Sequence, residues 1–362
     1  MAGRRFDEHE VRVRANPRGS RPRTKQRPEH ADAETGLVTG VDRGRYRLLL
    51  GLDTPDEREA LAMKARELGR DRVVPGDRVG VVGDTSGREG SLSRIVRIHD
   101  RTTILRRTAD DDDPVERVIV ANAHQLVVVT ALADPEPRTG MIDRCVAAGY
   151  DAGMDVLLAL TKSDLADPSP LRDLYEPIGV RVVVTGQTAG LDLHGLATVR
   201  EALAGRSSVF VGHSGVGKST LVNALVPDAR RAIGRVNEVT GRGRHTSSSA
   251  IALRLPAADG LAAGWVIDTP GVRSFGLAHV EPENLLPAFA DLADVALACP
   301  RGCIHTADAP DCALDEWVRD EWSARPGTAA DRVDGLDEVP LDVRAQRVDS
   351  FRRLLASRTT PA

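Results

Sequence analysis

The sequence predicts a multidomain α/β protein with a small antiparallel β unit, a central parallel α/β domain and a short, cysteine-containing helical domain. Three observations predict this order. Alternating runs broken by Gly and Asp come first, and near-continuous apolar runs separated by helix-like stretches follow. Three of the chain's four cysteines then fall between positions 299 and 312. At 362 residues, the chain is long enough for two or three domains, each with its own core.

Composition limits the class of protein. The hydrophobic content of 41% suits a soluble protein, and the aromatic content of 3% means that the core must be mostly Val, Leu, Ala and Ile. No apolar run approaches the length of a membrane span, and no apolar stretch follows the Arg-rich start. We therefore expect a cytoplasmic, monomeric protein without a membrane partner. The net charge of −4 gives no overall indication of nucleic acid.

The first 34 residues are predicted to be a disordered basic arm. Residues 1–30 hold nine Lys or Arg against four acidic residues, with three prolines and no apolar periodicity. Such an arm can contact a phosphate backbone without sequence preference. A solvated tail with no partner is the alternative.

Residues 35–108 are predicted to form an OB-fold domain. The runs at 35–50, 75–84 and 90–107 alternate and are broken by Gly and Asp, which fits a five-stranded OB-type barrel. We expect the charged stretch between the first two runs to be helical. Arg residues at 94–107 would give the barrel a basic face for RNA, although a plain β adaptor has the same pattern. The acidic run Asp110–Asp113, followed by Pro114, marks a linker.

Residues 109–280 carry the pattern of a parallel sheet covered on both faces. The last four of its five predicted strands each end in a polar, small-residue segment. In open α/β sheets ligands bind beyond the carboxyl ends of the strands, so these segments should converge on one site. The predicted strands are Gln125–Ala131, Asp155–Leu160, Arg181–Val184, Ser208–Val211 and Gly264–Ile267.

Gly212–Ser219 match the phosphate-binding loop G-x-x-x-x-G-K-[ST]. The match lies between an apolar strand and an amphipathic helix, where backbone N–H groups and the helix N-terminus can bind phosphates. Lys218 would reach the β and γ phosphates, and the Ser219 hydroxyl would hold Mg²⁺. A chance match in a chain with 33 glycines is the alternative, which the flanking strand and helix disfavour.

The base is predicted to be guanine. Thr161–Asp164 fit the motif [NT]-K-x-D, in which the Asp164 carboxylate accepts from N1–H and the N2 amino group of guanine and the Lys162 stem lies over the base. Adenine lacks both donors at those positions. Thr185-Gly186, after the next strand, would offer backbone amides to the guanine carbonyl. The expected nucleotide is therefore GTP, bound with Mg²⁺.

A third motif, Asp268-Thr269-Pro270-Gly271, fits D-x-x-G. Asp268 would orient Mg²⁺ through water, and the Gly271 amide would sense the γ-phosphate. Thr246 supplies the remaining hydroxyl, a second Mg²⁺ ligand on a mobile loop. Each motif alone also fits a turn or a helix cap, but together they strongly indicate a GTP site.

The order of these motifs is unusual, because Asp164 precedes Gly212 in the chain. In ordinary GTPases the phosphate loop comes first. Circular permutation accounts for the reversal without loss of the site, since a sheet depends on which strands are neighbours. The segment after Asp268 is then tethered directly to a nucleotide-driven switch.

That segment, predicted as a zinc-binding domain and helical tail over residues 281–362, holds Cys299, Cys303, His305 and Cys312 with the spacing C-x₃-C-x-H-x₆-C. Three thiolates and one imidazole predict one structural, closed tetrahedral Zn²⁺ site. The alternatives are reduced buried cysteines or a redox pair. The fourth cysteine, Cys145, is predicted to be a core residue.

The whole arrangement resembles the small ribosomal subunit biogenesis GTPase A family, circularly permuted, ribosome-dependent GTPases of bacteria. The resemblance covers roughly residues 35–325. It rests on VPGDRV, RTTILRR, ANAHQ, TKSD, GHSGVGKSTL, GRGRHTSS, DTPGV and the Cys/His cluster. It implies an OB-type β-barrel, a circularly permuted P-loop GTPase domain and a zinc-binding domain that dock on the 30S subunit and its 16S rRNA. The implied role is late 30S maturation, with subunit-stimulated hydrolysis of GTP to GDP promoting release.

The same resemblance assigns site residues. Zinc falls on the four residues of the Cys/His cluster. The chain departs from the family at two places: the family spacing of this cluster is closer to C-x₄-C-x-H-x₅-C, and Thr161 replaces a more familiar Asn in the base motif. GTP contacts fall on Thr161, Lys162, Ser163, Asp164, Gly212, His213, Ser214, Gly215, Val216, Gly217, Lys218, Ser219 and Thr220.

Catalysis is expected to involve Lys218, Asp268, Thr246 and His245. Val272 stands where many GTPases keep a water-orienting Gln, so the site should be slow alone. His245, on the loop with Thr246, is the candidate for ordering the attacking water once the ribosome orders that loop. An exposed loop histidine that touches rRNA is the alternative.

Three functions of different classes remain open. An assembly GTPase on the small subunit is the leading one. A P-loop ATPase or small-molecule kinase is disfavoured by the guanine motif, and a comparison of GTP with ATP binding separates it. An RNA-binding module with a structural GTP site would show negligible hydrolysis with 30S subunits present.

Overall fold

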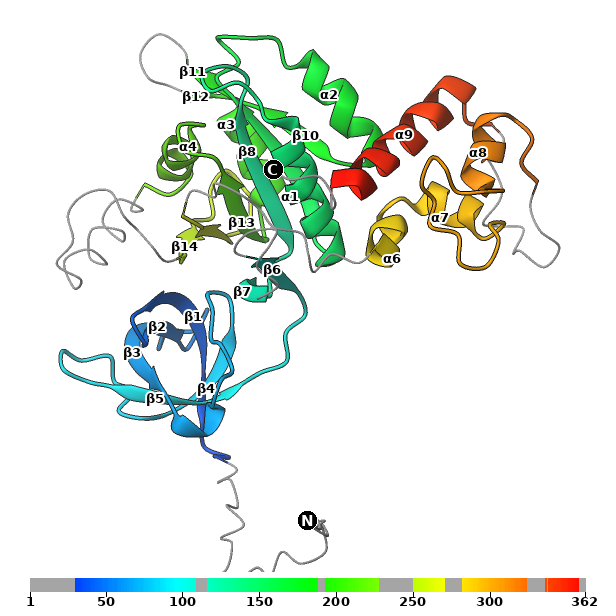
Figure 1. The fold of residues 1–362 in the computed structure, drawn as a ribbon. Helices are drawn as coiled ribbons and strands as arrows, with labels where there is room; N and C mark the ends of the chain where they lie inside the picture. Colours follow the sequence, from blue (N-terminus) through cyan, green and yellow to red (C-terminus); the bar gives the residue numbers. More distant parts are fainter. Residues whose placement is uncertain are drawn as a thin grey trace, which may run out of the picture.

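The computed structural model describes residues 30–108, 116–187, 193–227, 250–270, 282–323, 336 and 338–357. These residues form a β-barrel, an α/β domain beside it and a helical C-terminal segment packed on the α1 side of the α/β domain (Figure 1). The acidic linker, His245, Thr246 and Gly271 lie outside the described residues, as do residues 1–29 of the basic arm. Among the described helices, none has the length and apolarity needed to cross a membrane.

The first five strands form a closed barrel. Their order is β1-β2-β3-β5-β4, and β4 pairs again with β1, which closes the sheet. Alternate residues point inward to a core that includes Val38, Leu48 and Ile95. The OB-type barrel expected from the sequence is therefore confirmed. The strands are β1 (Glu34–Asp42), β2 (Arg45–Leu50), β3 (Arg58–Lys64), β4 (Arg78–Gly83) and β5 (Ser93–Ile98).

The expectation of a helix after β2 is wrong, because the middle of that stretch is strand β3. Its Ala, Leu, Met, Lys and Glu residues are good helix formers, which misled the sequence prediction. In the structure β3 pairs with β2 on one side and with β5 on the other. Ala60 and Ala62 point into the core while Leu61 and Met63 point outward, so pairing with the neighbouring strands decides the conformation against the hydrophobic pattern. Only the short turn η1 (Arg66–Leu68) is helical there.

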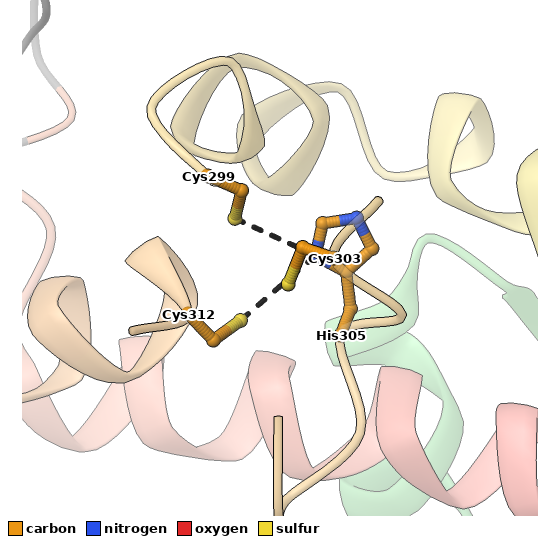
Figure 2. A group of neighbouring side chains, drawn as sticks. All are labelled: Cys299, Cys303, His305 and Cys312. Carbon is orange, nitrogen blue, oxygen red and sulfur yellow. Dashed lines mark hydrogen bonds between the residues drawn. The ribbon is translucent and has the colours of Figure 1, made fainter. Parts of the chain in front are cut away.

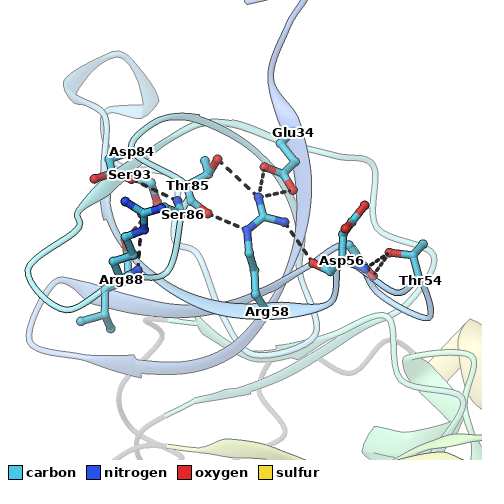
Figure 3. A network of polar contacts seen from close by, with 11 residues as sticks. Glu34, Thr54, Asp56, Arg58, Asp84, Thr85, Ser86, Arg88 and Ser93 are labelled. Atoms are coloured by element: carbon cyan, nitrogen blue, oxygen red, sulfur yellow. Dashed lines mark hydrogen bonds and ion pairs between the residues drawn. The ribbon is translucent and has the colours of Figure 1, made fainter.

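Arg58 fastens three parts of the barrel to one another (Figure 3). Its guanidinium donates to both carboxylate oxygens of Glu34 at 2.7 and 2.8 Å. It also donates to the carbonyl oxygens of Thr85 at 2.8 Å and Asp56 at 3.1 Å. The start of β1, the loop after β2 and the loop after β4 are thus held together by one side chain.

The α/β domain is built on six strands in the order β10-β9-β8-β13-β15-β14. All five runs predicted as strands are strands of this sheet, and each pairs in parallel with its neighbours among them. β14 is the exception, since it pairs with β15 in antiparallel orientation at the edge. The strands are β8 (Gln125–Ala131), β9 (Asp155–Thr161), β10 (Arg181–Val184), β13 (Ser207–Gly212), β14 (Ile251–Leu255) and β15 (Gly264–Asp268).

Helices cover both faces of this sheet, which explains its near-continuous apolar strands. One face packs with α1 (Thr139–Asp151) in a core cluster that extends into the C-terminal segment. The other packs with α3 (Leu196–Leu203) and α4 (Lys218–Leu225). Cys145 lies fully buried in the first cluster, as predicted. Short elements complete the domain: α2 (Ser169–Tyr175), η2 (Glu176–Ile178), β11 (Gly186–Gln187) and β12 (Leu193–His194).

A hairpin of β6 (Ile104–Thr108) and β7 (Glu116–Ala121) connects the barrel to the α/β domain. Its Leu105 and Val120 are fully buried in the cluster on the α1 face. The hairpin therefore packs with the α/β domain. The boundaries at residues 34, 108 and 280 stay predictions.

The C-terminal segment is tied to the α/β domain by the arginines of α9 (Leu341–Ser357). Arg353 pairs with Asp143 of α1 at 3.1 Å, and Arg347 donates to Asp291 of α7 and to the Pro177 carbonyl. α9 thus contacts α1 and residue Pro177 of the α/β domain as well as α7 of the C-terminal segment. The other elements are α6 (Pro282–Leu285), η3 (Leu286–Ala288), α7 (Ala290–Ala296) and α8 (Ala313–Val318).

Candidate functional site

The predicted phosphate loop follows β13 and leads directly into α4. Gly215 and Gly217 have φ of +85° and +88°, a left-handed conformation that favours glycine. A Cβ on Gly212 would lie 2.6 Å from the Val129 carbonyl oxygen, so the loop can pass this close to β8 only with glycine there. Ser214, Ser219 and Thr220 are exposed around the turn. The backbone amides before α4 can therefore face an anionic ligand.

Lys218 joins the phosphate loop to the D-x-x-G segment. Lys218 is buried, with 8% of the residue exposed, and its ammonium group donates to the Asp268 carboxylate and, at 2.6 Å, to the Thr269 carbonyl oxygen. The Thr269 hydroxyl in turn donates to the Phe210 carbonyl of β13 at 2.7 Å. Two motifs that are 50 residues apart in the chain thus meet at one lysine.

Thr161, at the end of β9, joins the base motif to the phosphate loop. Its hydroxyl lies 2.6 Å from the Val216 carbonyl oxygen and 3.2 Å from that of Thr130. Thr161 is buried, so the shorter contact is a bond in a shielded environment. Thr161, which stands in place of a more familiar Asn, thus makes this connection through its hydroxyl.

Lys162 is positioned by a residue that the sequence analysis missed. It adopts φ +58°, and its ammonium donates to the carbonyl oxygen of Asp134, which follows β8. The Ser163 amide donates to the Thr185 carbonyl at 3.1 Å, which joins the motif to the segment after β10. No sequence motif marks Asp134. Its position just beyond a sheet strand was the available signal.

A cavity of ≈ 320 Å³ opens between the base motif and the phosphate loop. Leu165 and Leu221 supply apolar wall, while Lys162, Asp164 and Thr220 supply polar groups. This is the size range and mixed lining of a small-ligand pocket. Its lining residues are Thr161, Lys162, Asp164, Leu165, Thr185, Gly186, Gly217, Thr220 and Leu221. His213 lies outside this lining, with its Nδ1 3.0 Å from the Ser214 carbonyl oxygen.

The Cys/His cluster forms a second candidate site (Figure 2). The ligand atoms of Cys299, Cys303, His305 and Cys312 all lie within 4.8 Å of one another. Cys299 follows α7 and Cys312 caps α8, while Cys303 and His305 come from the loop between them. The Nδ1 atom of His305 lies 3.6 Å from the Cys299 sulfur and 3.9 Å from the Cys312 sulfur. Four ligands converge on one point, as a tetrahedral site requires.

One of the three sulfur atoms, that of Cys312, is held in an environment that favours a thiolate, whereas burial raises the pKa of Cys303. The contact from Cys299, helped by His305, holds the pKa of the Cys312 thiol well below its usual range. The same contact, together with burial, raises the pKa of Cys299. The Ala313 amide, at the start of α8, donates to the Cys299 sulfur at 3.3 Å. This set of soft ligands fits Zn²⁺ chemistry, because zinc binds deprotonated cysteines.

β9, which leads to the base motif, precedes β13, which leads to the phosphate loop, in the chain. The base motif and the phosphate loop nevertheless meet in space through Thr161 and Val216. The class is a circularly permuted P-loop GTPase, an enzyme that hydrolyses GTP. A sequence model described as RsgA GTPase matches residues 98–278, which is half of the chain. The chain belongs to the RsgA GTPase family.

Relatives and solved structures agree with this assignment. A small ribosomal subunit biogenesis GTPase RsgA of Serratia proteamaculans is 35% identical over 316 residues, covering 84% of this chain and 86% of the relative. One of Alcanivorax borkumensis is 36% identical over 251 residues, covering 67% of each. YjeQ from Thermotoga maritima has a similar fold, with a TM-score of 0.56 at 23% identity over 89% of this chain and 98% of that chain.

Proposed function

We propose that this GTPase acts on the small ribosomal subunit during its late maturation. In this proposal, 30S binding stimulates the hydrolysis of GTP to GDP, and hydrolysis promotes release. The curated relatives named above are small ribosomal subunit biogenesis GTPases, which supports the choice of subunit. The contact that carries the proposal is the Thr161–Val216 hydrogen bond, because it holds a guanine-type motif against a phosphate loop.

The proposed GTP site uses Thr161–Asp164 for the base and Gly212–Thr220 for the phosphates. Asp164 lines the cavity where guanine would lie, and Lys162 stands beside it. Lys218 would leave its contact with Asp268 to reach the β and γ phosphates. Ser219 and Thr246 would hold Mg²⁺, which neutralises charge on the phosphates when bound. The exposed hydroxyl of Ser219 at the first turn of α4 suits that role.

We also propose that His245 orders the attacking water when the subunit orders its loop. The described residues that line the base cavity or contact Lys218 offer Asp164 and Asp268 as acidic groups and no histidine. Val272 stands where many GTPases keep a water-orienting Gln, so another group is needed near the γ-phosphate. Replacement of His245 by Ala should abolish subunit-stimulated turnover while leaving GTP affinity nearly intact.

The Cys/His cluster is proposed to hold one structural Zn²⁺. The four ligand atoms fit the distances of such a site, and filling all four positions with protein leaves none for a substrate. The C-terminal segment would then be a fixed docking surface for the 30S subunit, with the barrel contacting 16S rRNA. The chain is proposed to act as a monomer.

The decisive experiment is GTP turnover by the full chain with and without purified 30S subunits. Large stimulation supports the proposal, and negligible hydrolysis with 30S present would overturn it in favour of an RNA-binding module with a structural GTP site. Replacement of Lys218 by Ala gives the inactive control. A titration with GTP and ATP in parallel tests the base, since equal affinity for both would indicate an ATPase or kinase.

A further inference from the structure

The edge of the α/β sheet is occupied by the barrel. β14 is the edge strand, and its Ile251 pairs with Gly40 of barrel strand β1. Ile251 is also the residue of β14 that lies opposite Asp268 in β15. Gly40, Ile251 and Asp268 therefore stand in one line across three strands. The barrel is thus two strand pairings away from the carboxylate that contacts Lys218.

Arg254, on the same strand, clamps the barrel. Its Nη1 atom donates to both carboxylate oxygens of Glu57 at 2.6 and 2.7 Å, and its Nη2 atom donates to Asp53. Both acids belong to the loop between β2 and β3. The guanidinium also lies 5.8 Å from the centroid of the Trp265 ring on β15. Arg254 therefore contacts the barrel loop and the strand that ends at Asp268.

The barrel loop is prepared for this contact. The Asp53 amide donates to Glu57 at 3.0 Å, and Asp53 adopts φ +60° to present both carboxylates together. This amide and the Arg254 side chain hold the pKa of Glu57 below its ordinary value. The loop thus presents two negative charges at the position that Arg254 reaches.

A second attachment of the barrel lies away from the nucleotide residues. The Ala121 amide donates to the Pro75 carbonyl at 3.1 Å, and the Asn122 side chain donates to the Gly76 carbonyl at 2.9 Å. A Cβ on Gly76 would lie 2.0 Å from the Ala121 carbonyl oxygen, so this contact is too close for any other residue. The barrel is therefore held at one point before β8 and at another on β14.

We propose that the barrel is an intramolecular partner of the sheet edge, and that Arg254 couples its placement to the nucleotide at Lys218 and Asp268. The inference rests on the proposed GTP site. Bound phosphates and Mg²⁺ would separate Lys218 from Asp268, which moves the end of β15. β14 follows through its pairing with β15, and the barrel follows through Ile251 and Arg254. An exposed sheet edge is a common place for one structural unit to add to another.

Coupling of this kind is reciprocal, so the barrel contact must also change nucleotide preference. If the contact of Arg254 with the barrel loop is stronger when one nucleotide is bound, then removal of the Arg254 side chain weakens the binding of that nucleotide more than the binding of the other. Arg254 acts here as a positioning residue, since it contacts no predicted nucleotide group. The ratio of GTP to GDP affinity is the quantity that a merely structural role would leave unchanged.

Hydrogen exchange of the full chain tests the coupling directly. With a nonhydrolysable GTP analogue in place of GDP, amides at 38–42 and 51–57 should change their exchange rates by about threefold or more. Amides of β4 serve as the internal control. Unchanged rates at 38–42 and 51–57, with protection at 212–220, would overturn the coupling alone. No protection at 212–220 with either nucleotide would overturn the GTP site and the coupling with it.

A mutant series supplies the second arm. Arg254→Ala should change the ratio of GTP to GDP affinity about fivefold or more, and Arg254→Lys should restore part of the change. Arg319→Ala is the matched control, because Arg319 pairs with Glu321 at 3.0 Å in the C-terminal segment, after α8. A ratio in Arg254→Ala equal to that of Arg319→Ala and the wild type would contradict the proposal.

Discussion

The Thr161 hydroxyl donates a 2.6 Å hydrogen bond to the Val216 carbonyl oxygen across 55 positions of sequence. Thr161 is the last residue of β9 and the first of the predicted base motif, and Val216 lies inside the phosphate loop. The bond fixes the distance between the two halves of the proposed site before any nucleotide arrives. Such preorganisation lowers the entropy lost on binding.

Replacement of Thr161 by Val removes this hydroxyl with little change of shape. The Val216 carbonyl loses its buried donor, so GTP affinity should fall about tenfold, which corresponds to roughly 1.4 kcal/mol. A fluorescent GTP analogue titrated against each variant measures the change. Thr161→Ser should retain most of the affinity, and Thr39→Val, in the barrel, should have none of the effect. Wild-type affinity in Thr161→Val would show that the bond does not position the site.

Replacement of Asp164 by Asn tests the base assignment. The carboxylate would accept two donors from guanine, and an amide cannot do so without leaving one unpaired. GTP affinity should fall by about 100-fold or more, while xanthosine triphosphate, which offers a carbonyl in place of the amino group, should bind better than GTP. Competition between the two nucleotides for a labelled analogue measures the switch. An unchanged preference for GTP would move the base to another part of the cavity.

Much of the α/β domain was predictable because its strands are buried on both faces. The five predicted runs became strands with at most one added residue at either end. β3 was not predictable in the same way. Its buried positions are alanines and its exposed ones include Leu61 and Met63, so hydrophobic alternation points the wrong way. Pairing with β2 and β5 decides its conformation, and that is a tertiary effect.

The candidate site could likewise be predicted from the sequence only in part. Motif residues such as Lys218 and Asp268 could be found from sequence because their chemistry requires particular residue types at fixed spacing. The groups that hold them are mostly backbone carbonyls, as at Val216 and Asp134, and a carbonyl leaves no mark in a sequence. The clamp by Arg254 was also hidden, since its partners are about 200 residues away.

Removal of one ligand tests the metal site. Cys303→Ala should reduce bound zinc from about one per chain to near zero and lower the melting temperature, because the loop between α7 and α8 loses the bond that closes it. Metal analysis of the purified chain together with thermal unfolding measures both effects. Cys145→Ala is the matched control, since Cys145 is buried in the core and should keep the metal while losing some stability. Full zinc content in Cys303→Ala would exclude that residue as a ligand.

The contact between α1 and α9 should respond to pH through Asp143. Burial raises the pKa of this carboxyl, and Arg353 and Tyr175 offset only part of the rise. Its folded form therefore binds a proton more tightly than its unfolded form. The stabilisation is present below the unfolded pKa and is lost as pH rises through the raised folded pKa. The free energy of unfolding of the wild type minus that of Asp143→Asn should thus be larger at acidic pH than at pH 7.

Urea unfolding of both proteins at several pH values measures this difference. The Tyr175 hydroxyl donates to Asp143 at 2.9 Å and lowers its pKa, so Tyr175→Phe should raise that pKa further. The free energy of unfolding of Tyr175→Phe minus that of the Tyr175→Phe, Asp143→Asn double variant should therefore keep changing up to a higher pH. The comparison is with the difference between the wild type and Asp143→Asn. A difference that stays constant with pH would mean that water reaches the carboxyl. The contact between α1 and α9 would then open in solution, because the closed contact leaves Asp143 only 3% exposed.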